Sequence, residues 1–289
     1  KSWRVLCETA QLAREVFLPG DEAVNIVGTV PPQHMYGLET TVFFALAAGC
    51  AAHHAKPFFP ADVRAALAAV PAPRLLITTP VHLRALLGAG VKLPELRLMI
   101  SATAPLDTEL AAQAEDRFDA PLQEIYGCTE AGSMASRRPR ASSQWQLHPG
   151  MRIEACDGSA CISGEHLPLA IPLNDVVDIA DARRFHLLGR DADMVKVAGK
   201  RASLADLTQR LLAIPGVDDA VLFVPDGGAR PAALVVAPGL RESQILAALA
   251  PQIDPVFLPR PLCMVERLPR DALGKLPHAR LQELIRKNA

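Results

Sequence analysis

The sequence LLGRDADMVKVAGKR, residues Leu187 to Arg201, separates two parts of the chain that have different patterns. It joins a Gly-Arg pair, a group of acids, an apolar–Lys–apolar run and a final Gly-Lys-Arg. Before it, short apolar runs alternate with helical patterns. After it comes a shorter segment of different rhythm that ends in the loop PRDALGK, Pro269 to Lys275. The stretch therefore predicts a domain boundary that also carries chemistry.

The part before this boundary alternates predicted strands with predicted helices. The expected strands are 24–28, 51–54, 75–78, 97–100 and 122–126, and the expected helices are 38–48, 60–70, 80–87 and 107–118. Repeated strand–helix units with short links favour an α/β fold, with a mostly parallel sheet and helices on its faces. Ligands of such sheets bind at the edge where the carboxyl ends of the strands lie.

The pattern changes after Gly132. Residues 133–150 are polar and contain proline, as expected of a loop. MRIEAC and SACISG flank Asp157-Gly158, which is a strong hairpin signal. With 175–179 and 184–188 they predict a small antiparallel β subdomain at about 145–189. We expect residues 1–189 to belong to one large domain and residues 190–289 to form a smaller, mobile α+β C-terminal domain.

The composition limits the class of protein. The 30 lysines and arginines nearly balance the 31 aspartates and glutamates, which gives no indication of a nucleic-acid or membrane-surface partner. The longest apolar stretch, Thr40 to Ala52, is too short to span a bilayer, and no leader pattern begins the chain. The six cysteines lack Cys-x-x-Cys spacing, which disfavours a zinc site or disulfides and predicts a cytoplasmic protein.

The motif YGCTE, Tyr126 to Glu130, directly follows a predicted strand at the ligand-binding edge. Its glycine allows a sharp turn, the Thr129 hydroxyl can hydrogen-bond to a phosphate oxygen, and the Glu130 carboxylate can bind magnesium. An aromatic ring beside them can stack on a nucleobase. Taken alone, the motif is more typical of a turn that ends a strand and carries a helix cap.

These residues, together with the central stretch, resemble the adenylate-forming ligases, which include acyl- and aryl-CoA synthetases, luciferases and peptide-synthetase adenylation domains. The linker of that family is similar to GRxDDxIKxxGxR, and Tyr-Gly-x-Thr-Glu is one of its hallmarks. The resemblance implies that Tyr126 and Gly127 belong to the nucleotide site, with the Tyr126 ring beside adenine. It also implies that Thr129 contacts the phosphate and that Glu130 binds Mg²⁺.

A second nucleotide segment is expected in SATAPLDTEL, residues 101–110. Family members commonly have Gly-Gly-Ala-Pro-Leu here, and the backbone of that segment lies along the adenine. This chain has Ala102, Thr103 and Ala104 instead, and glycine is the residue that best permits such a close approach. Taken alone, the segment is an ordinary strand-to-helix loop with a helix cap at Asp107.

Asp175 lies fifteen positions before Arg190. In the family, an aspartate at this spacing binds both ribose hydroxyls and the arginine of the Gly-Arg pair also reaches the ribose. A carboxylate suits this role because its two oxygens can accept from two neighbouring hydroxyls. Leu173-Asn174 replaces the usual Thr-Gly, and an acid on the surface of a strand is the local alternative.

The C-terminal part carries the remaining catalytic residue implied by the resemblance. Lys275 matches the lysine of the closing Pro-Lys-x-x-x-Gly-Lys loop, which stabilises the charge that develops on phosphorus during adenylation. Gly199, Lys200 and Arg201 are expected to face the thiol acceptor. Ala192 stands where the family has a pivot Asp or Lys.

The acid-binding pocket is expected after the first strand. By resemblance it contains His34, with Met35, Tyr36 and Cys128 as neighbours. The resemblance implies an ATP-dependent and Mg²⁺-dependent ligase that adenylates a small carboxylic acid. An aryl acid such as a hydroxybenzoate is favoured, and the acyl group then passes to the thiol of CoA or of the phosphopantetheine on an acyl carrier protein.

Two alternatives stay open at this level. The family's Gly/Ser/Thr-rich phosphate loop is absent from the sequence, and we expect the chain to begin just after it. The chain can therefore also be a non-catalytic module that binds AMP or acyl-AMP, or an inactive fragment. A nicotinamide or flavin enzyme is disfavoured because the Gly-x-Gly-x-x-Gly fingerprint is missing.

Overall fold

The apolar runs predicted as strands form the parallel half of a nine-stranded sheet with the order β11-β12-β7-β6-β5-β4-β3-β1-β2. The parallel strands are β1 (Asn25–Gly28), β2 (Ala51–Ala52), β3 (Arg74–Thr78), β4 (Leu98–Ser101) and β5 (Leu122–Cys128). The central strands β3 and β4 are covered on both faces, which explains their continuous apolar sequences. The predicted α/β fold is confirmed.

The structure is a computed structural model that describes residues 1–20, 23–156, 159–190, 194–228, 230–270 and 276–288. The chain divides into two units. The first contains Lys1–Leu173 and Val177–Leu187, and the second contains Asn174–Val176 and Leu188–Ala289.

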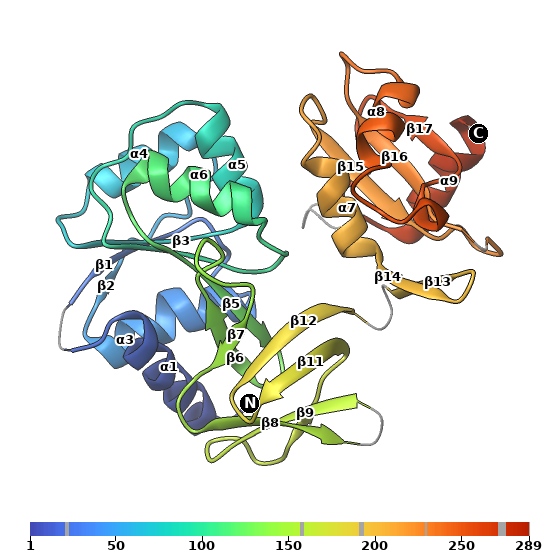
Figure 1. Cartoon of the computed structure of the whole chain (residues 1–289). Helices are drawn as coiled ribbons and strands as arrows, with labels where there is room; N and C mark the ends of the chain where they lie inside the picture. The colour runs from blue at the N-terminus through green and yellow to red at the C-terminus, as the bar shows by residue number, and fades with distance from the viewer. Residues whose placement is uncertain (21–22, 157–158, 191–193, 229, 271–275, 289) are drawn as a thin grey trace. The chain divides into compact units, whose positions relative to one another are not determined.

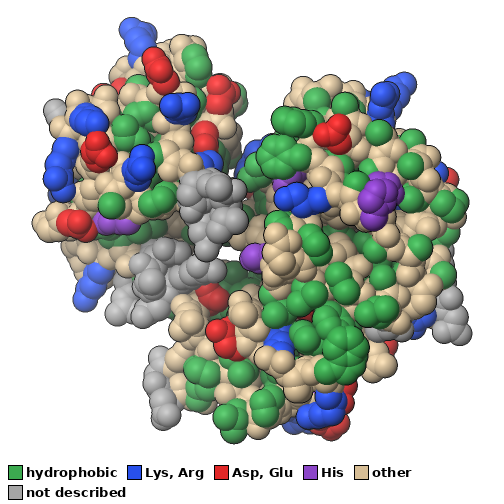
Figure 2. All heavy atoms as spheres, turned by 180° about the vertical axis from the view of Figure 1, so that it is seen from behind, with side chains coloured by type: hydrophobic (Ala, Val, Ile, Leu, Met, Phe, Trp, Pro, Cys, Tyr) green, Lys and Arg blue, Asp and Glu red, His purple; other side chains and the backbone are tan. Residues whose placement is uncertain are grey.

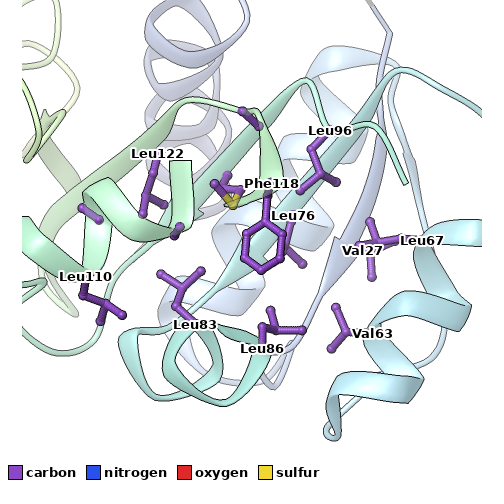
Figure 3. Packing of buried hydrophobic residues seen from close by; sticks show 14 of the residues in the cluster. Val27, Val63, Leu67, Leu76, Leu83, Leu86, Leu96, Leu110, Phe118 and Leu122 are labelled. Atoms are coloured by element: carbon purple, nitrogen blue, oxygen red, sulfur yellow. The ribbon is translucent and has the colours of Figure 1, made fainter. Parts of the chain in front are cut away.

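Helices cover both faces of the parallel strands (Figure 1). One face carries α4 (Pro60–Ala68), α5 (Pro80–Gly88) and α6 (Thr108–Phe118), and the other carries α1 (Trp3–Phe17) and α3 (Phe44–Ala48). On the first face, leucines from all three helices and from β3 interlock around Phe118 (Figure 3). Fully burying one such side chain stabilises the fold by about 2 kcal/mol.

The predicted helix 38–48 is wrong as a single regular helix. The chain instead forms α2 (Met35–Gly37), a π-helix η1 (Leu38–Phe43) and then α3. Thr40 and Thr41 each donate a side-chain hydroxyl to the backbone carbonyl four residues earlier. Such bonds compete with the regular helical pattern and bend helices.

The antiparallel strands also differ from the prediction. Residues 133–150 are not a loop, because they contain β6 (Gly132–Arg137) and β7 (Trp145–Leu147), which continue the large sheet beyond β5. The strands β11 (Asp175–Asp181) and β12 (Arg184–Arg190) join the same sheet. Among the described residues, the separate small sheet contains β8 (Met151–Cys156), β9 (Ser159–Gly164) and β10 (Ile171–Pro172).

The expectation of unpaired cysteines is wrong for one pair. Cys156 and Cys161 form a disulfide across the β8–β9 hairpin, with a Cα–Cα distance of 5.9 Å. The hairpin register brings the two side chains within bonding range, and their sequence spacing alone does not show this. The bridge removes one of the sequence arguments for a reducing compartment.

The second unit is an α+β unit, as predicted. It contains β13 (Met194–Val197), β14 (Lys200–Ser203), α7 (Leu204–Leu212), β15 (Asp219–Phe223), β16 (Ala232–Val236), α8 (Glu242–Leu249), a short 3₁₀ helix at Pro255–Phe257, β17 (Leu262–Met264) and α9 (His278–Asn288). Ser203 caps α7 by accepting a hydrogen bond from the backbone N–H of Asp206 at 3.3 Å. Leu207 and Leu211 of α7 pack into the core of this unit.

Charged side chains of both signs are mixed over the face seen in Figure 2, in agreement with the balanced composition. Within the described ranges, we find no helix with the length and apolar character needed to cross a membrane.

Candidate active site

The turn after β5 presents two of the predicted catalytic residues. Thr129 and Glu130 are exposed between the end of β5 and the start of β6. The two strands approach closely at Gly127, where a Cβ atom would lie 2.2 Å from the carbonyl oxygen of Gly132. Only glycine fits at such a contact. The close approach of the two strands at Gly127 therefore produces a tight turn, from which the Thr129 and Glu130 side chains project.

The charge of Glu130 is set locally. Its own backbone N–H, and then the Cys128 thiol, hydrogen-bond to the Glu130 carboxylate and lower its pKa. Burial raises the pKa of the Cys128 thiol, whose sulfur also accepts from the Ala131 N–H at 3.4 Å. Glu130 is therefore an ionised, exposed carboxylate at neutral pH. A single carboxylate fits Mg²⁺, which is commonly bound by one or two carboxylates together with substrate phosphates.

The loop after β4 lies beside the end of β5. Ser101, the last residue of β4, pairs with Glu124 of β5, so Ala102, Thr103 and Ala104 follow next to the YGCTE segment. Ala102 is buried, whereas Thr103 and Ala104 are exposed. Thr103 has a φ of 79°, in the left-handed region that a β-branched residue rarely adopts. This is the conformation that the family's glycine would adopt without strain.

The Tyr126 ring is more deeply buried than the resemblance implied. It is 9% exposed and packs against Trp145 of β7 and Phe185 of β12, with ring centroids 5.6 and 5.5 Å away. These contacts fix the orientation of the ring at the end of β5. They join the parallel and antiparallel halves of the sheet at the point where the YGCTE turn begins.

The predicted acid-binding segment reaches the ends of β3 and β4. The Tyr36 hydroxyl lies 3.1 Å from the Thr78 carbonyl oxygen and 2.9 Å from that of Ile100, so this side chain ties the segment to both strands. His34 is exposed, and its Nδ1 accepts from the Tyr36 N–H at 3.4 Å, which caps α2. Met35 is half-buried. The structure thus brings His34 and Met35 to the edge that also carries loop 102–104.

Sequence reasoning missed Glu39, which is 3% exposed. Both of its carboxylate oxygens accept from the backbone N–H of Ser133, at 3.1 and 3.0 Å. Burial raises its pKa to about 7, and the opposite charge of Lys1 lowers it in part. The sequence could have indicated Glu39, because it is an isolated acid inside the apolar run 38–48. An acid on a buried helix face needs a hydrogen-bonding or charged partner.

The predicted ribose residues lie on one hairpin. The strands β11 and β12 are neighbours in the large sheet, and Asp175 begins β11 while Arg190 ends β12. Both residues belong to the second unit. Asp175 is half-buried.

The residues predicted to face the acceptor lie in the β13–β14 hairpin. Ala198 and Gly199 form its tip with φ values of 49° and 81°, as in a tight turn that matches the twist of the strands. Lys200 donates to the Asp254 carboxylate, and this hydrogen bond lowers the pKa of Asp254. Arg201 pairs with Lys196 across the hairpin backbone. Lys275 and Ala192 lie outside the described residues.

The geometry defines a class of protein. A parallel α/β sheet with two adjacent nucleotide-type loops at its carboxyl edge, followed by a small α+β unit, is the arrangement of the adenylate-forming fold. The chain belongs to the AMP-binding enzyme family, which matches residues 4–159.

Three known proteins are similar to this chain. A 4-coumarate–CoA ligase from Rhodobacter capsulatus is 32% identical over 85% of this chain and 61% of its own length. A salicylyl-CoA synthase / salicylate adenylyltransferase from Streptomyces is 26% identical over 68% of this chain and 43% of its own length. The o-succinylbenzoate CoA synthetase of Bacillus subtilis, in complex with ATP and magnesium, superposes with a TM-score of 0.83 at 18% identity and covers 98% of this chain. The chain thus spans less than two thirds of these relatives.

Proposed function

We propose that the protein containing this chain is an acid–thiol ligase that uses ATP. In the first step a carboxylate attacks the α-phosphate of ATP, which gives an acyl-AMP and releases pyrophosphate. In the second step a thiol attacks the acyl carbon and AMP leaves. The observation that carries the proposal is the exposed Thr129–Glu130 turn beside loop 102–104, at the carboxyl edge of a sheet in a member of the AMP-binding enzyme family.

Each residue has a physical reason for its proposed role. The Thr129 hydroxyl can donate to a phosphate oxygen, and the Glu130 carboxylate can hold Mg²⁺, which neutralises phosphate charge. Asp175 and Arg190, at the ends of the neighbouring strands β11 and β12, suit the ribose. Lys275, which matches the lysine of the family's closing loop, would bring an ammonium to the reacting phosphate and stabilise the charge that develops there.

The proposed acid is a small aryl acid. The two curated relatives above are named for 4-coumarate and salicylate, and the solved neighbour is named for o-succinylbenzoate. In this chain, exposed His34 offers a ring nitrogen and half-buried Met35 offers apolar surface at the same edge. One polar group beside an apolar side chain suits a flat acid.

CoA is the proposed acceptor, and these relatives are named as CoA ligases or synthetases. Gly199 would leave room for the thiol arm, and Lys200 and Arg201 would meet its phosphate groups. Phosphopantetheine on a carrier protein presents the same thiol and is the second acceptor to be tested. The cytoplasmic location expected from the sequence stays a prediction.

The experiment is ATP–pyrophosphate exchange with full-length protein and a panel of acids, which includes hydroxybenzoates, cinnamates, short-chain acids and fatty acids. We expect exchange that depends on Mg²⁺ and is fastest with one aryl acid. Transfer to CoA and to a phosphopantetheinylated carrier protein is then compared by mass spectrometry. If no acid supports exchange while AMP still binds, the chain is the non-catalytic AMP-binding module and the ligase proposal is wrong.

A further inference from the structure

Glu39 is a buried acid that the proposed chemistry does not use. It lies in the π-helix η1, among residues that pack against the sheet. Local π-helical geometry is rare and is frequent at functional sites. Its carboxylate reaches a residue 94 positions away, Ser133, the second residue of β6, just beyond the Thr129–Glu130 turn.

The Ser133 N–H is available to Glu39 because the β5–β6 ladder is irregular there. Tyr126 pairs with Ala135 but Gly127 pairs with Ser133, so β6 has an extra residue, Met134, at this point. A β-bulge of this kind leaves a backbone group without its regular hydrogen-bond partner and bends the strand that contains it. Glu39 supplies the missing acceptor.

The surroundings of the carboxylate are tight and charged. A Cβ atom on Gly132 would lie 3.1 Å from each Glu39 oxygen, so the backbone of the turn contacts the carboxylate directly. The Lys1 ammonium, from the residue before the N-cap of α1, faces Glu39 and also lies near Cys128 and Glu130 and 3.7 Å from the Met35 sulfur.

The Glu39 carboxylate is buried but accepts from one backbone N–H, that of Ser133. Removing a carboxylate from water costs free energy that a neutral acceptor of the same shape would avoid. Burial correspondingly raises the pKa of Glu39 to about 7. A hydrogen bond to an ionised acceptor is roughly twice as strong as one to a neutral acceptor. In its ionised form, which is more than half of the population above about pH 7, Glu39 thus holds the turn more firmly than a neutral acceptor would, at the expense of stability.

We propose that Glu39 is the positioning residue of the Thr129–Glu130 turn. By holding the Ser133 N–H, it fixes the start of β6 three residues after Glu130. The close approach of β5 to β6 at Gly127 fixes the other end of the same turn. The Glu130 carboxylate is thereby presented in one orientation to Mg²⁺ and the nucleotide phosphates. This inference rests on the proposed nucleotide-dependent function, which it deepens.

The test uses Glu39→Ala and Glu39→Gln in the full-length protein. Hydrogen exchange of the peptide that spans Thr129 to Ser133 is measured first. We expect faster exchange of the turn in Glu39→Ala, and an intermediate rate in Glu39→Gln, which keeps an uncharged acceptor. The second measurement is calorimetric binding of ATP at a series of Mg²⁺ concentrations. Loss of a group that orients a metal ligand typically weakens metal binding about 10-fold or more, and because Glu39 acts on Glu130 through the backbone of the turn we expect a shift of about 10-fold in the Mg²⁺ needed.

The matched control is Glu115→Gln. Glu115 also binds the backbone N–H that begins a strand, that of Leu122 at 2.8 Å, but it does so at the opposite end of β5. We expect this variant to lose stability without any change in the Mg²⁺ requirement. The KM for the acid should stay within about twofold in both Glu39 variants, since a general distortion would change acid and metal binding together.

Two results overturn the inference. In the first, Glu39→Ala binds Mg²⁺ and ATP like the parent, or its turn exchanges at the parent rate. In the second, Glu115→Gln shifts the Mg²⁺ requirement as much as Glu39→Ala. Failure of the proposed ligase function is distinguishable, because it appears as the absence of acid-dependent exchange in the parent protein. The hydrogen-exchange measurement then still decides whether Glu39 holds the turn.

Discussion

Two buried groups in the first unit should make the free energy of unfolding respond to pH in opposite directions. His148 is 1% exposed and lies edge-on to Phe17, and burial, followed by the charge of His166, lowers its pKa to about 4. Neither ring nitrogen has a hydrogen-bond partner among the described residues. Burial raises the pKa of Glu39 to about 7. Each group therefore titrates at a different pH in the folded and unfolded chain.

The signs follow from which state binds the proton. The folded pKa of His148 lies below its unfolded value of 6.5, so its contribution to stability is present above about pH 6.5 and is lost as the pH falls towards 4. The folded pKa of Glu39 lies above its unfolded value of 4.5, so its contribution is present below about pH 4.5 and is lost as the pH rises through 7. At about 1.4 kcal/mol per pH unit, each change amounts to about 3 kcal/mol.

In the parent protein, Glu39 and His148 change the free energy of unfolding with pH in opposite directions. Single variants should separate the two contributions. Relative to the parent, Glu39→Gln should gain about 3 kcal/mol of unfolding free energy between about pH 4.5 and 7. His148→Phe should gain a similar amount as the pH falls from about 6.5 to 4. Urea unfolding followed by the emission of Trp145, which is buried in the same unit, measures both differences. A change of side-chain volume also alters the unfolding free energy, but by the same amount at every pH, so it does not affect how the difference between variant and parent varies with pH. Differences that do not vary with pH would refute the reasoning.

Further predictions concern the turn, the loop and the hairpins. Thr103→Gly should raise the free energy of unfolding by about 1 kcal/mol, because a non-glycine residue costs about 1–2 kcal/mol in the left-handed region; a loss of stability in urea titrations would contradict this. Gly127→Ala should cost about 2 kcal/mol or more and abolish pyrophosphate exchange. Gly88→Ala, in the last turn of α5 with open space around it, should keep or slightly raise the stability and leave the exchange unchanged. Lys275→Ala should lose most adenylation with a melting temperature near that of the parent, and a large drop in melting temperature would instead mark a structural role. Cys156→Ser should lower the unfolding free energy by about 2 kcal/mol under oxidising conditions, and equal stability of both proteins would speak against the bridge.

The parallel half of the fold was predictable because each of its strands and helices is indicated by a pattern within its own short segment of sequence. The strands β3 and β4 are continuous apolar runs, and helices with caps at Thr79 and Asp107 follow β3 and β4. Burial on both faces requires such runs whatever the rest of the chain does. The YGCTE turn and loop 102–104 were expected at the same edge for the same topological reason, and they lie there.

The missed features depend on pairing between distant residues. The strand β6 contains the buried serines Ser133 and Ser136, and its polar sequence suggested a loop although its backbone joins the ladder. The contact between Glu39 and Ser133 spans 94 positions and depends on a bulge that no local pattern shows. The disulfide likewise depends on the hairpin register.

The strand β2 sits at one border of the nine-stranded sheet and has only two residues, Ala51–Ala52. A border strand offers unpaired backbone groups on which another chain can add a strand, and this is a common first step in aggregation. Here such an added strand would find only two positions of ladder before the chain turns away into His53 and His54. The brevity of β2 therefore protects this border from strand addition by a neighbouring molecule.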